Sequence, residues 1–188
     1  MFRRICITNR HLTMDLPVQI RRAIESGADT IILREKDMAE EEYQELAESV
    51  DEVCKEMGAK LILHTFKDAA QRLGIRRIHL TMGDFLKLED HERESFETIG
   101  VSTHSTDEAL LAERLGASYI TASPIFETDC KPGVRPAGLG YLREVAGAVN
   151  IPVYALGGIS EDNMSACMAA GASGACMMSG YMKQEMIK

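Results

Sequence analysis

One short pattern recurs along this chain of 188 residues and constrains its fold more than any other feature. A helix-like segment ends in glycine, often followed by alanine, and a short apolar run comes next. Glycine ends a helix readily because it adopts positive φ without a Cβ clash. The apolar run is too short for a helix but suits a strand buried on both faces. Such alternation predicts βαβ units and a parallel sheet. The pattern occurs at 26–36, 57–65, 73–81, 115–126 and 170–180.

Eight strands are predicted, and helical segments separate them, the clearest at 39–57, 106–115 and 161–170. Thr106 and Ser160 are the expected N-caps of the second and third of these helices, because acidic residues follow each of them. Eight strands alternating with helices predict an α/β fold, a closed (β/α)₈ TIM barrel. The strands are expected at approximately 3–8, 30–35, 60–64, 76–81, 98–103, 119–123, 153–157 and 174–178.

A doubly wound sheet built from the same strands is the alternative. It usually carries a glycine-rich turn after the first strand, and ICITNRHLT has no glycine. The barrel is short, since about 200 residues or more are usual, and only YMKQEMIK follows the last strand. We therefore expect residues 1–188 to form a single TIM-barrel domain with a truncated last helix.

Charge and cysteine content exclude several classes of protein. The formal net charge of −8 disfavours a nucleic-acid partner, although a local cluster of cations can still bind an anion. The five cysteines are odd in number and form no C-x-x-C pair, which favours reduced thiols and a cytoplasmic location. No stretch approaches the roughly 20 apolar residues that a membrane span needs.

The polar residues at the predicted carboxyl ends of the strands are the candidate site, because this end of a barrel carries the functional residues. Arg34 and Lys36 lie on one side of a strand by the period of two, and two cations at a barrel mouth bind phosphate or carboxylate strongly. An ion pair with the acidic segment 40–48 is the competing interpretation. Other candidates are Thr8, Asn9, His64, Thr65, Thr81, Asp84, Ser102, His104 and Ser123.

Two glycine-containing turns predict a phosphate site. Gly157 and Gly158 end the seventh strand, and Ser179 and Gly180 follow the eighth. Backbone N–H groups approach an anion closely at such turns, and phosphate sites in this architecture often lie after strands seven and eight. Simple tight turns are the alternative reading.

The remaining candidates lie in one long loop and among the histidines. The loop 125–136 offers Lys131 as a cation, and Cys130 has no neighbouring base in the sequence. His64 and His104 are expected at the mouth, where either can move a proton near neutral pH, or else serve as hydrogen-bonded structural residues. His79 is expected to be a packed residue inside or beneath the fourth strand.

Six motifs in this order resemble the thiamine phosphate synthase/TenI family. They are LREK (33–36), IHLTMGD (78–84), GVSTHS (100–105), SPIFETDCKPG (123–133), ALGGI (155–159) and GACMMSG (174–180). The resemblance spans nearly the whole chain and implies a (β/α)₈ barrel that acts on thiazole phosphate compounds in thiamine biosynthesis.

In the synthase branch of this family, a pyrimidine diphosphate loses pyrophosphate and the thiazole nitrogen captures the pyrimidine methyl cation. The resemblance implies that Arg34, Lys36 and Lys131 hold the diphosphate and that Ser102 assists the leaving group. Asp84 matches an acid that binds magnesium. The thiazole phosphate is then expected on Gly157, Gly158, Ser179 and Gly180.

Three departures from the synthase and TenI patterns shape the expected function. His64-Thr65 replaces the Asn-Asp of the synthases, and Ile32 replaces a glutamine that contacts the pyrimidine. The loop ETDCKPG is closer to the TenI branch, but Pro124 stands where TenI enzymes have a histidine. We expect a TenI-like thiazole tautomerase, an isomerase that needs no metal, with His64, Lys131 and Ser102 as catalytic residues and His104 among the substrate-binding residues.

Two alternatives to the tautomerase remain open at this point. One is a thiamine phosphate synthase, a transferase with Mg²⁺ on Asp84, and the other is a non-catalytic barrel that binds a phosphate ligand. The truncated C-terminal segment leaves the apolar eighth strand poorly covered. That exposure predicts a homodimer with Met182 and Met186 as contacts, unless the connection between the first two strands closes the gap.

Overall fold

The computed structural model describes residues 1–128 and 133–183, which form eight parallel strands closed into a barrel. Each strand pairs with the next in the sequence, and β8 pairs with β1 to close the ring. The (β/α)₈ prediction is therefore confirmed. The strands are β1 (Arg3–Ile7), β2 (Thr30–Arg34), β3 (Lys60–His64), β4 (Arg77–Thr81), β5 (Thr98–Thr103), β6 (Tyr119–Ala122), β7 (Val153–Leu156) and β8 (Gly174–Met177).

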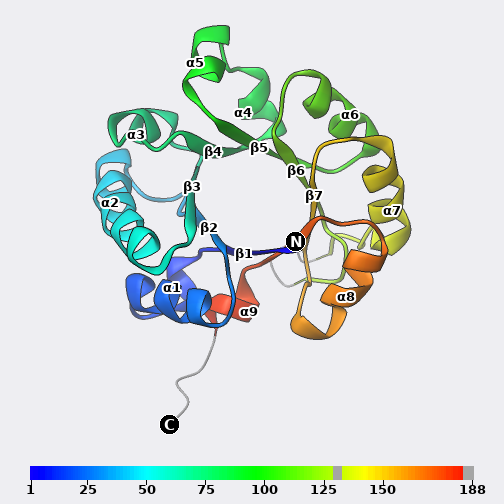
Figure 1. The fold of residues 1–188 in the computed structure, drawn as a ribbon, viewed down its shortest axis with the longest axis horizontal. Coiled ribbons are helices and arrows are strands. Elements are labelled where there is room, and N and C mark those ends of the chain that lie inside the picture. The colour runs from blue at the N-terminus through cyan, green and yellow to red at the C-terminus, as the bar shows by residue number, and fades with distance from the viewer. Residues whose placement is uncertain (129–132, 184–188) are drawn as a thin grey trace.

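The helices surround this ring of strands (Figure 1). Ser160 caps its helix as predicted, but Ser105 rather than Thr106 caps the helix after β5. Gly58 ends the longest helix with a φ of 74°. The helices are η1 (Arg10–Leu12), α1 (Leu16–Glu25), α2 (Glu40–Met57), α3 (Lys67–Arg72), α4 (Met82–Leu86), α5 (Asp90–Ser95), α6 (Thr106–Arg114), α7 (Gly138–Ala148), α8 (Glu161–Ala169) and α9 (Ser179–Met182).

Two apolar layers hold the barrel together. The larger layer lies between the strands and the helices, and the smaller one fills the inside of the barrel with six buried side chains. Because side chains alternate along a strand, residues two apart face the same way. The interior of the barrel therefore contains stacked layers of side chains, and the ends of each strand carry the layers nearest to solvent. The six interior residues are Ile5, Ile7, Ile32, Ile62, Tyr119 and Cys176.

The last helix is short, as predicted, but it does not leave the barrel open. α9 packs against α1, and Nε2 of Gln19 donates a hydrogen bond to the carbonyl of Tyr181 at 2.5 Å. Met182 is 1% exposed. It is packed within its own chain, so its assignment as a dimer contact is wrong. Met186 lies outside the described residues.

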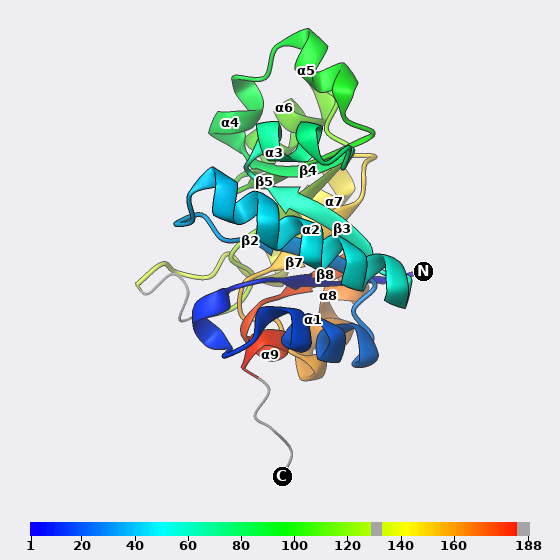
Figure 2. The ribbon, with the colours of Figure 1, turned by 90° about the vertical axis from the view of Figure 1, so that its left-hand side faces the viewer.

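The two ends of the barrel differ in what they carry. In Figure 2 the strands run from the right, near the N-terminus, to the left, where η1 and the loop after β6 lie. The functional candidates that lie among the described residues belong to the left-hand, carboxyl end. None of the helices in 1–128 and 133–183 has the length and apolar character needed to cross a membrane.

Candidate functional site

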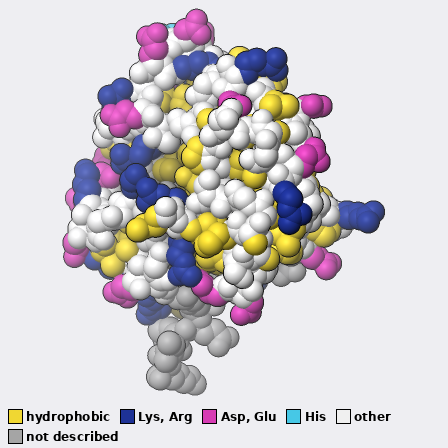
Figure 3. Space-filling model, turned by 45° about the vertical axis from the view of Figure 1, so that its right-hand side comes forward, with side chains coloured by type: hydrophobic (Ala, Val, Ile, Leu, Met, Phe, Trp, Pro, Cys, Tyr) yellow, Lys and Arg dark blue, Asp and Glu magenta, His cyan; other side chains and the backbone are white. Residues whose placement is uncertain are grey.

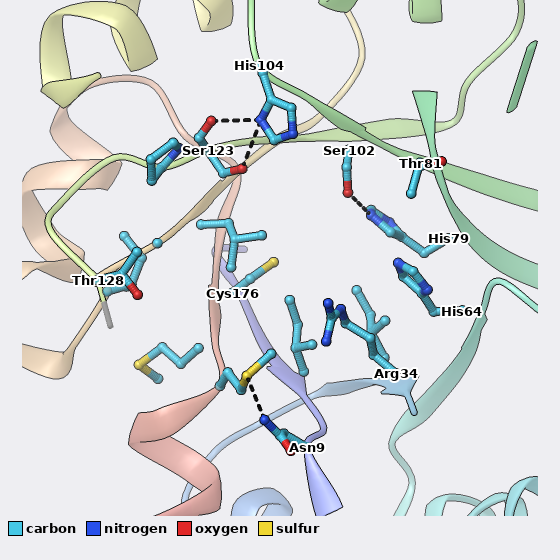
Figure 4. A pocket seen from close by; sticks show the side chains of 18 of the residues that line it. Asn9, Arg34, His64, His79, Thr81, Ser102, His104, Ser123, Thr128 and Cys176 are labelled. Atoms are coloured by element: carbon cyan, nitrogen blue, oxygen red, sulfur yellow. Dashed lines mark hydrogen bonds between the residues drawn. The ribbon is translucent and has the colours of Figure 1, made fainter. Parts of the chain in front are cut away.

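A cavity of about 600 Å³ opens at the carboxyl ends of the strands. Residues from all eight strands or the loops after them line it, so residues far apart in the sequence meet there (Figure 4). Its lining includes Asn9, Ile32, Arg34, Lys36, His64, His79, Thr81, Ser102, His104, Ser123, Gly157, Gly158, Cys176 and Ser179.

The cations of β2 and the loop after it reach this cavity. Arg34 and Lys36 both line it, as the period of two predicts. Glu35, between them in sequence, is 2% exposed and accepts hydrogen bonds from the Thr8 hydroxyl at 2.6 Å and from the Arg10 backbone at 3.1 Å. The acidic start of α2 pairs with Arg72 through Glu40 at 3.4 Å. The cations therefore face the ligand space, and Glu35 holds the loop after β1.

A polar column runs through the barrel beneath Ser102. Nε2 of His79 lies 2.8 Å from Oγ of Ser102, and its Nδ1 lies 3.0 Å from the hydroxyl of Tyr119. Burial, and then the charge of Lys36, lowers the pKa of His79 to about 3. A neutral imidazole has one N–H donor and one acceptor nitrogen. His79 therefore donates to one hydroxyl and accepts from the other.

His64 lies beside His79 but does not titrate near neutral pH. The two rings stack with their centroids 5.5 Å apart, and Nδ1 of His64 is 2.7 Å from Oγ1 of Thr65. Burial, followed by His79 and the charges of Lys36 and Arg34, lowers the pKa of His64 to about 2. The prediction that His64 carries a proton near neutral pH is therefore wrong, because its imidazole stays neutral.

His104 directly follows β5 and lies next to the end of β6. Its Nδ1 is 2.9 Å from the carbonyl of Ser123 and 3.3 Å from the hydroxyl of the same residue (Figure 4). A carbonyl oxygen only accepts hydrogen bonds, so Nδ1 carries the proton in the bond to it. The ring is fixed to the start of the loop after β6, and the Ser123 side chain also lines the cavity.

The two glycines after β7 line the cavity, and close packing requires glycine at both positions. Gly157 and Gly158 have φ of 97° and 65°. A Cβ at Gly157 would lie 2.8 Å from Cα of Pro124, and one at Gly158 would lie 2.3 Å from the carbonyl oxygen of Glu127. Only glycine lets the turn after β7 touch the loop after β6. Ser179, which begins α9, faces the same cavity, and Gly180 follows it in that helix.

Asp84 lies at the edge of this site. It belongs to the first turn of α4, next to Gly83, which lines the cavity. One of its carboxylate oxygens accepts a hydrogen bond from the Thr81 hydroxyl at 2.7 Å. Within residues 1–128 and 133–183, no three His, Cys, Asp or Glu side chains are grouped to hold a metal.

Two candidates from the loop after β6 lie outside the described residues, namely Lys131 and Cys130. The four cysteines within the described ranges are buried free thiols. Of these, Cys176 lines the cavity, and burial raises the pKa of its thiol. Since the thiolate is the reactive form, Cys176 is an apolar floor residue rather than a nucleophile.

Sequence reasoning missed the contribution of His79. Its position was predicted correctly as the inside of β4, but its link to Ser102 was not. Thr81 was expected at the mouth, and the period of two places His79 on the same side, one layer deeper. This spacing of two residues is the signal by which the sequence could have placed His79 directly beneath the residues of the mouth.

Comparisons of the sequence and the fold with known proteins identify a family. The sequence profile described as "Thiamine monophosphate synthase" matches residues 5–181. A protein of Halalkalibacterium halodurans named "Thiamine-phosphate synthase" is 35% identical over 191 residues, covering 100% of this chain and 90% of that protein. One of Aquifex aeolicus named "Putative thiamine-phosphate synthase 2" is 35% identical over 164 residues, covering 87% and 88%.

A solved structure shares the fold. "Thiamine phosphate pyrophosphorylase from Pyrococcus furiosus" superposes with a TM-score of 0.85 and 29% identity, and the match covers 98% of this chain and 89% of that one. Relatives that match along most of this chain thus carry the synthase name. The expectation of a thiazole tautomerase, an isomerase, is therefore wrong, and the comparisons do not distinguish a TenI branch.

Proposed function

The chain belongs to the thiamine monophosphate synthase family, and from that membership we propose that it is a thiamine-phosphate synthase. It joins a pyrimidine diphosphate to a thiazole phosphate. The bond between the pyrimidine methylene carbon and the diphosphate oxygen breaks, and pyrophosphate leaves with the electron pair. The lone pair of the thiazole nitrogen then forms the new C–N bond. The observation that carries this proposal is the match to synthases along nearly the whole chain.

The diphosphate is assigned to the side of the cavity formed by β2 and β5. Arg34 and Lys36 provide positive charge there, and Lys131 in the loop after β6 is assigned to the same group. Charge builds up on the leaving oxygen as the C–O bond breaks, and a preorganised donor stabilises it. The Ser102 hydroxyl is that donor, and His79 holds it in place.

The thiazole phosphate is assigned to the opposite side, where the turn after β7 meets the start of α9. Gly157, Gly158 and Ser179 line the cavity there, and Gly180, the next residue of α9, is assigned to the same group. Backbone N–H groups at such turns bind phosphate oxygens without repulsion from side chains. The two substrates then meet above the apolar floor, with the thiazole nitrogen directed toward the pyrimidine methylene.

The donor set fits a magnesium ion that arrives with the diphosphate. Mg²⁺ is usually bound by one or two carboxylates together with substrate phosphates. Asp84, in the first turn of α4 at the edge of the mouth, is the carboxylate assigned to it. When bound, magnesium neutralises charge on the departing pyrophosphate. Thr65 stands in place of a second acid. Its hydroxyl contacts His64, and it brings no negative charge to the site.

A coupling assay tests the proposal. The purified protein is incubated with the pyrimidine diphosphate, the thiazole phosphate and MgCl₂, and thiamine phosphate and pyrophosphate are measured together. We expect both products in equal amounts. A protein that binds the thiazole phosphate by calorimetry but forms neither product would contradict a synthase and support the non-catalytic barrel.

Three further assignments accompany this proposal. We infer a cytoplasmic location from the free thiols of the described cysteines, and we infer that residues 1–188 act as one domain. The homodimer was predicted from a poorly covered eighth strand, and α9 packs against α1 at this place. The homodimer therefore stays a prediction without that structural support, and light scattering is its test.

A further inference from the structure

A second cavity lies at the opposite, amino end of the barrel. It has a volume of about 110 Å³ and lies where the strands begin. Six of its lining residues are the first residues of the strands β1 to β6. Its lining consists of Arg3, Ile5, Thr30, Lys60, Ile62, Arg77, Thr98, Tyr119 and Tyr154.

The register of the barrel directs these first residues inward. Thr30 pairs with Lys60, and Arg77 pairs with Thr98 across neighbouring strands. Because side chains alternate, each lies on the same face as the interior residue two positions later, as Lys60 does with Ile62. They form the lowest interior layer of the barrel. In most barrels such layers are filled by branched apolar side chains, so a cationic layer needs another explanation.

Three positive charges meet in this layer without a matching number of acids. Arg3, Lys60 and Arg77 line the cavity, and its described lining contains no Asp or Glu. Asp29, just outside, lies 3.7 Å from Arg3 and is 30% exposed. Like charges held together repel one another, and an anion relieves that cost. This local excess of positive charge arises in a chain whose formal net charge is −8.

The cationic layer is held in position by the backbone and bordered by hydroxyl groups. Nε of Arg77 donates a hydrogen bond to the carbonyl of Leu61 at 2.8 Å, which directs its guanidinium across β3. Thr98 and Tyr154 add hydroxyl groups to the wall. Figure 3, in which the amino ends of the strands are turned toward the left, shows Lys and Arg side chains gathered on that part of the surface.

We propose that this layer binds an inorganic tetrahedral oxyanion, of the phosphate or sulfate class, at a site separate from the catalytic mouth. Guanidinium and ammonium groups are the strongest side-chain donors to such oxygens. The cavity has less than a fifth of the volume of the mouth, which suits a small anion. The apolar layer with Ile5 and Ile62 separates the two cavities. The inference does not depend on the proposed reaction.

Chemical labelling of lysines tests this site without interference from the mouth. The wild-type protein is treated with an amine-reactive acetylating reagent across a series of inorganic phosphate concentrations. Sodium chloride keeps the ionic strength constant, and mass spectrometry follows each lysine. We expect phosphate to slow the labelling of Lys60. Lys55, on the outside of α2 in an ion pair with Asp51, is the internal control and keeps its rate.

A variant links the protection to the cationic layer. In Arg77→Gln, the phosphate concentration that half-protects Lys60 is expected to rise about tenfold or more, as for the loss of one charge-assisted hydrogen bond. The mouth variant Arg34→Gln leaves that concentration unchanged. Labelling of Lys60 at the same rate with and without phosphate in the wild-type protein would overturn the proposal, whether or not the Arg77 variant folds. Equal protection of Lys55 and Lys60 would also overturn it.

Discussion

Nε2 of His79 lies 2.8 Å from Oγ of Ser102, so a buried imidazole supports a hydroxyl at the wall of the site. The other ring nitrogen contacts Tyr119, whose hydroxyl group is anchored deeper in the barrel. The low pKa of His79 keeps its imidazole neutral. In the proposed reaction His79 is therefore a positioning residue, and Ser102 is the group assigned to meet the substrate.

Ser102→Ala removes the proposed donor to the leaving oxygen. We expect the turnover of the coupling reaction to fall by about 10²-fold, the usual effect of losing one preorganised donor. The KM for the thiazole phosphate should change little, because that substrate binds on the other side. Steady-state kinetics with each substrate varied in turn measures both effects, and full activity in the variant would exclude this role.

His79→Leu tests the support beneath Ser102. It leaves two hydroxyl groups, of Ser102 and Tyr119, without their ring partner. We expect a loss of about 1–3 kcal/mol in the free energy of unfolding and a lower kcat with a nearly unchanged KM for the thiazole phosphate. His79→Gln, which keeps hydrogen-bonding atoms, should recover part of the rate. Urea unfolding and steady-state kinetics on both variants measure these effects. A His79→Leu enzyme with the wild-type kcat would contradict the role of His79 in positioning Ser102.

Asp84→Asn tests how magnesium is held. Among the described residues no three metal-binding side chains are grouped here, so we expect the free protein to show no magnesium binding in the micromolar range by calorimetry. In the coupling assay the variant should need at least about tenfold more magnesium for half-maximal rate. Asp90→Asn, an exposed acid on α5, is the control. Micromolar binding by the free protein that disappears in Asp84→Asn would show a site formed by the protein alone.

Gly158→Ala tests the turn assigned to the thiazole phosphate. The added Cβ would lie 2.3 Å from the carbonyl oxygen of Glu127, at a φ of 65°. We expect a loss of at least about 1–2 kcal/mol in the free energy of unfolding, from the backbone conformation alone, and a higher KM for the thiazole phosphate. Gly140→Ala in α7 is the matched control, because nothing lies within 4 Å of its added Cβ. An unchanged KM would remove this turn from the substrate site.

The fold was predictable because its signals are local and repeated. The strand beginning at Arg3 and the helix beginning at Glu161 lie where the pattern placed them, within a residue. Glycine at a helix end and a buried apolar run each have a short-range physical cause. The end of the chain was less predictable, since the packing of α9 on α1 depends on a contact between Gln19 and Tyr181, far apart in sequence.

The site was predictable in its location and less so in its chemistry. Arg34 and Ser102 line one cavity, as expected from their positions at strand ends. The protonation of His64 was not predictable, because the low pKa comes from burial and from neighbours on other segments. The choice between isomerase and synthase rested on a few substituted positions such as Thr65. Those substitutions remove single contacts and leave the shared framework of the family intact.

The buried histidines predict how stability depends on pH. Both His64 and His79 have folded-state pKa values, about 2 and about 3, far below the value of 6.5 expected when unfolded. The unfolded chain therefore binds more protons below pH 6.5, and stability falls as the pH decreases from there toward 3. Between pH 6 and pH 5 we expect each histidine to reduce the free energy of unfolding by about 1 kcal/mol.

Urea unfolding measured at both pH values tests this expectation. The decrease in the free energy of unfolding should be smaller in His64→Gln and in His79→Gln than in the wild-type protein. It should be unchanged in His91→Gln, whose side chain is 75% exposed. A wild-type decrease that neither buried-site variant reduces would mean that these imidazoles are protonated in the folded protein.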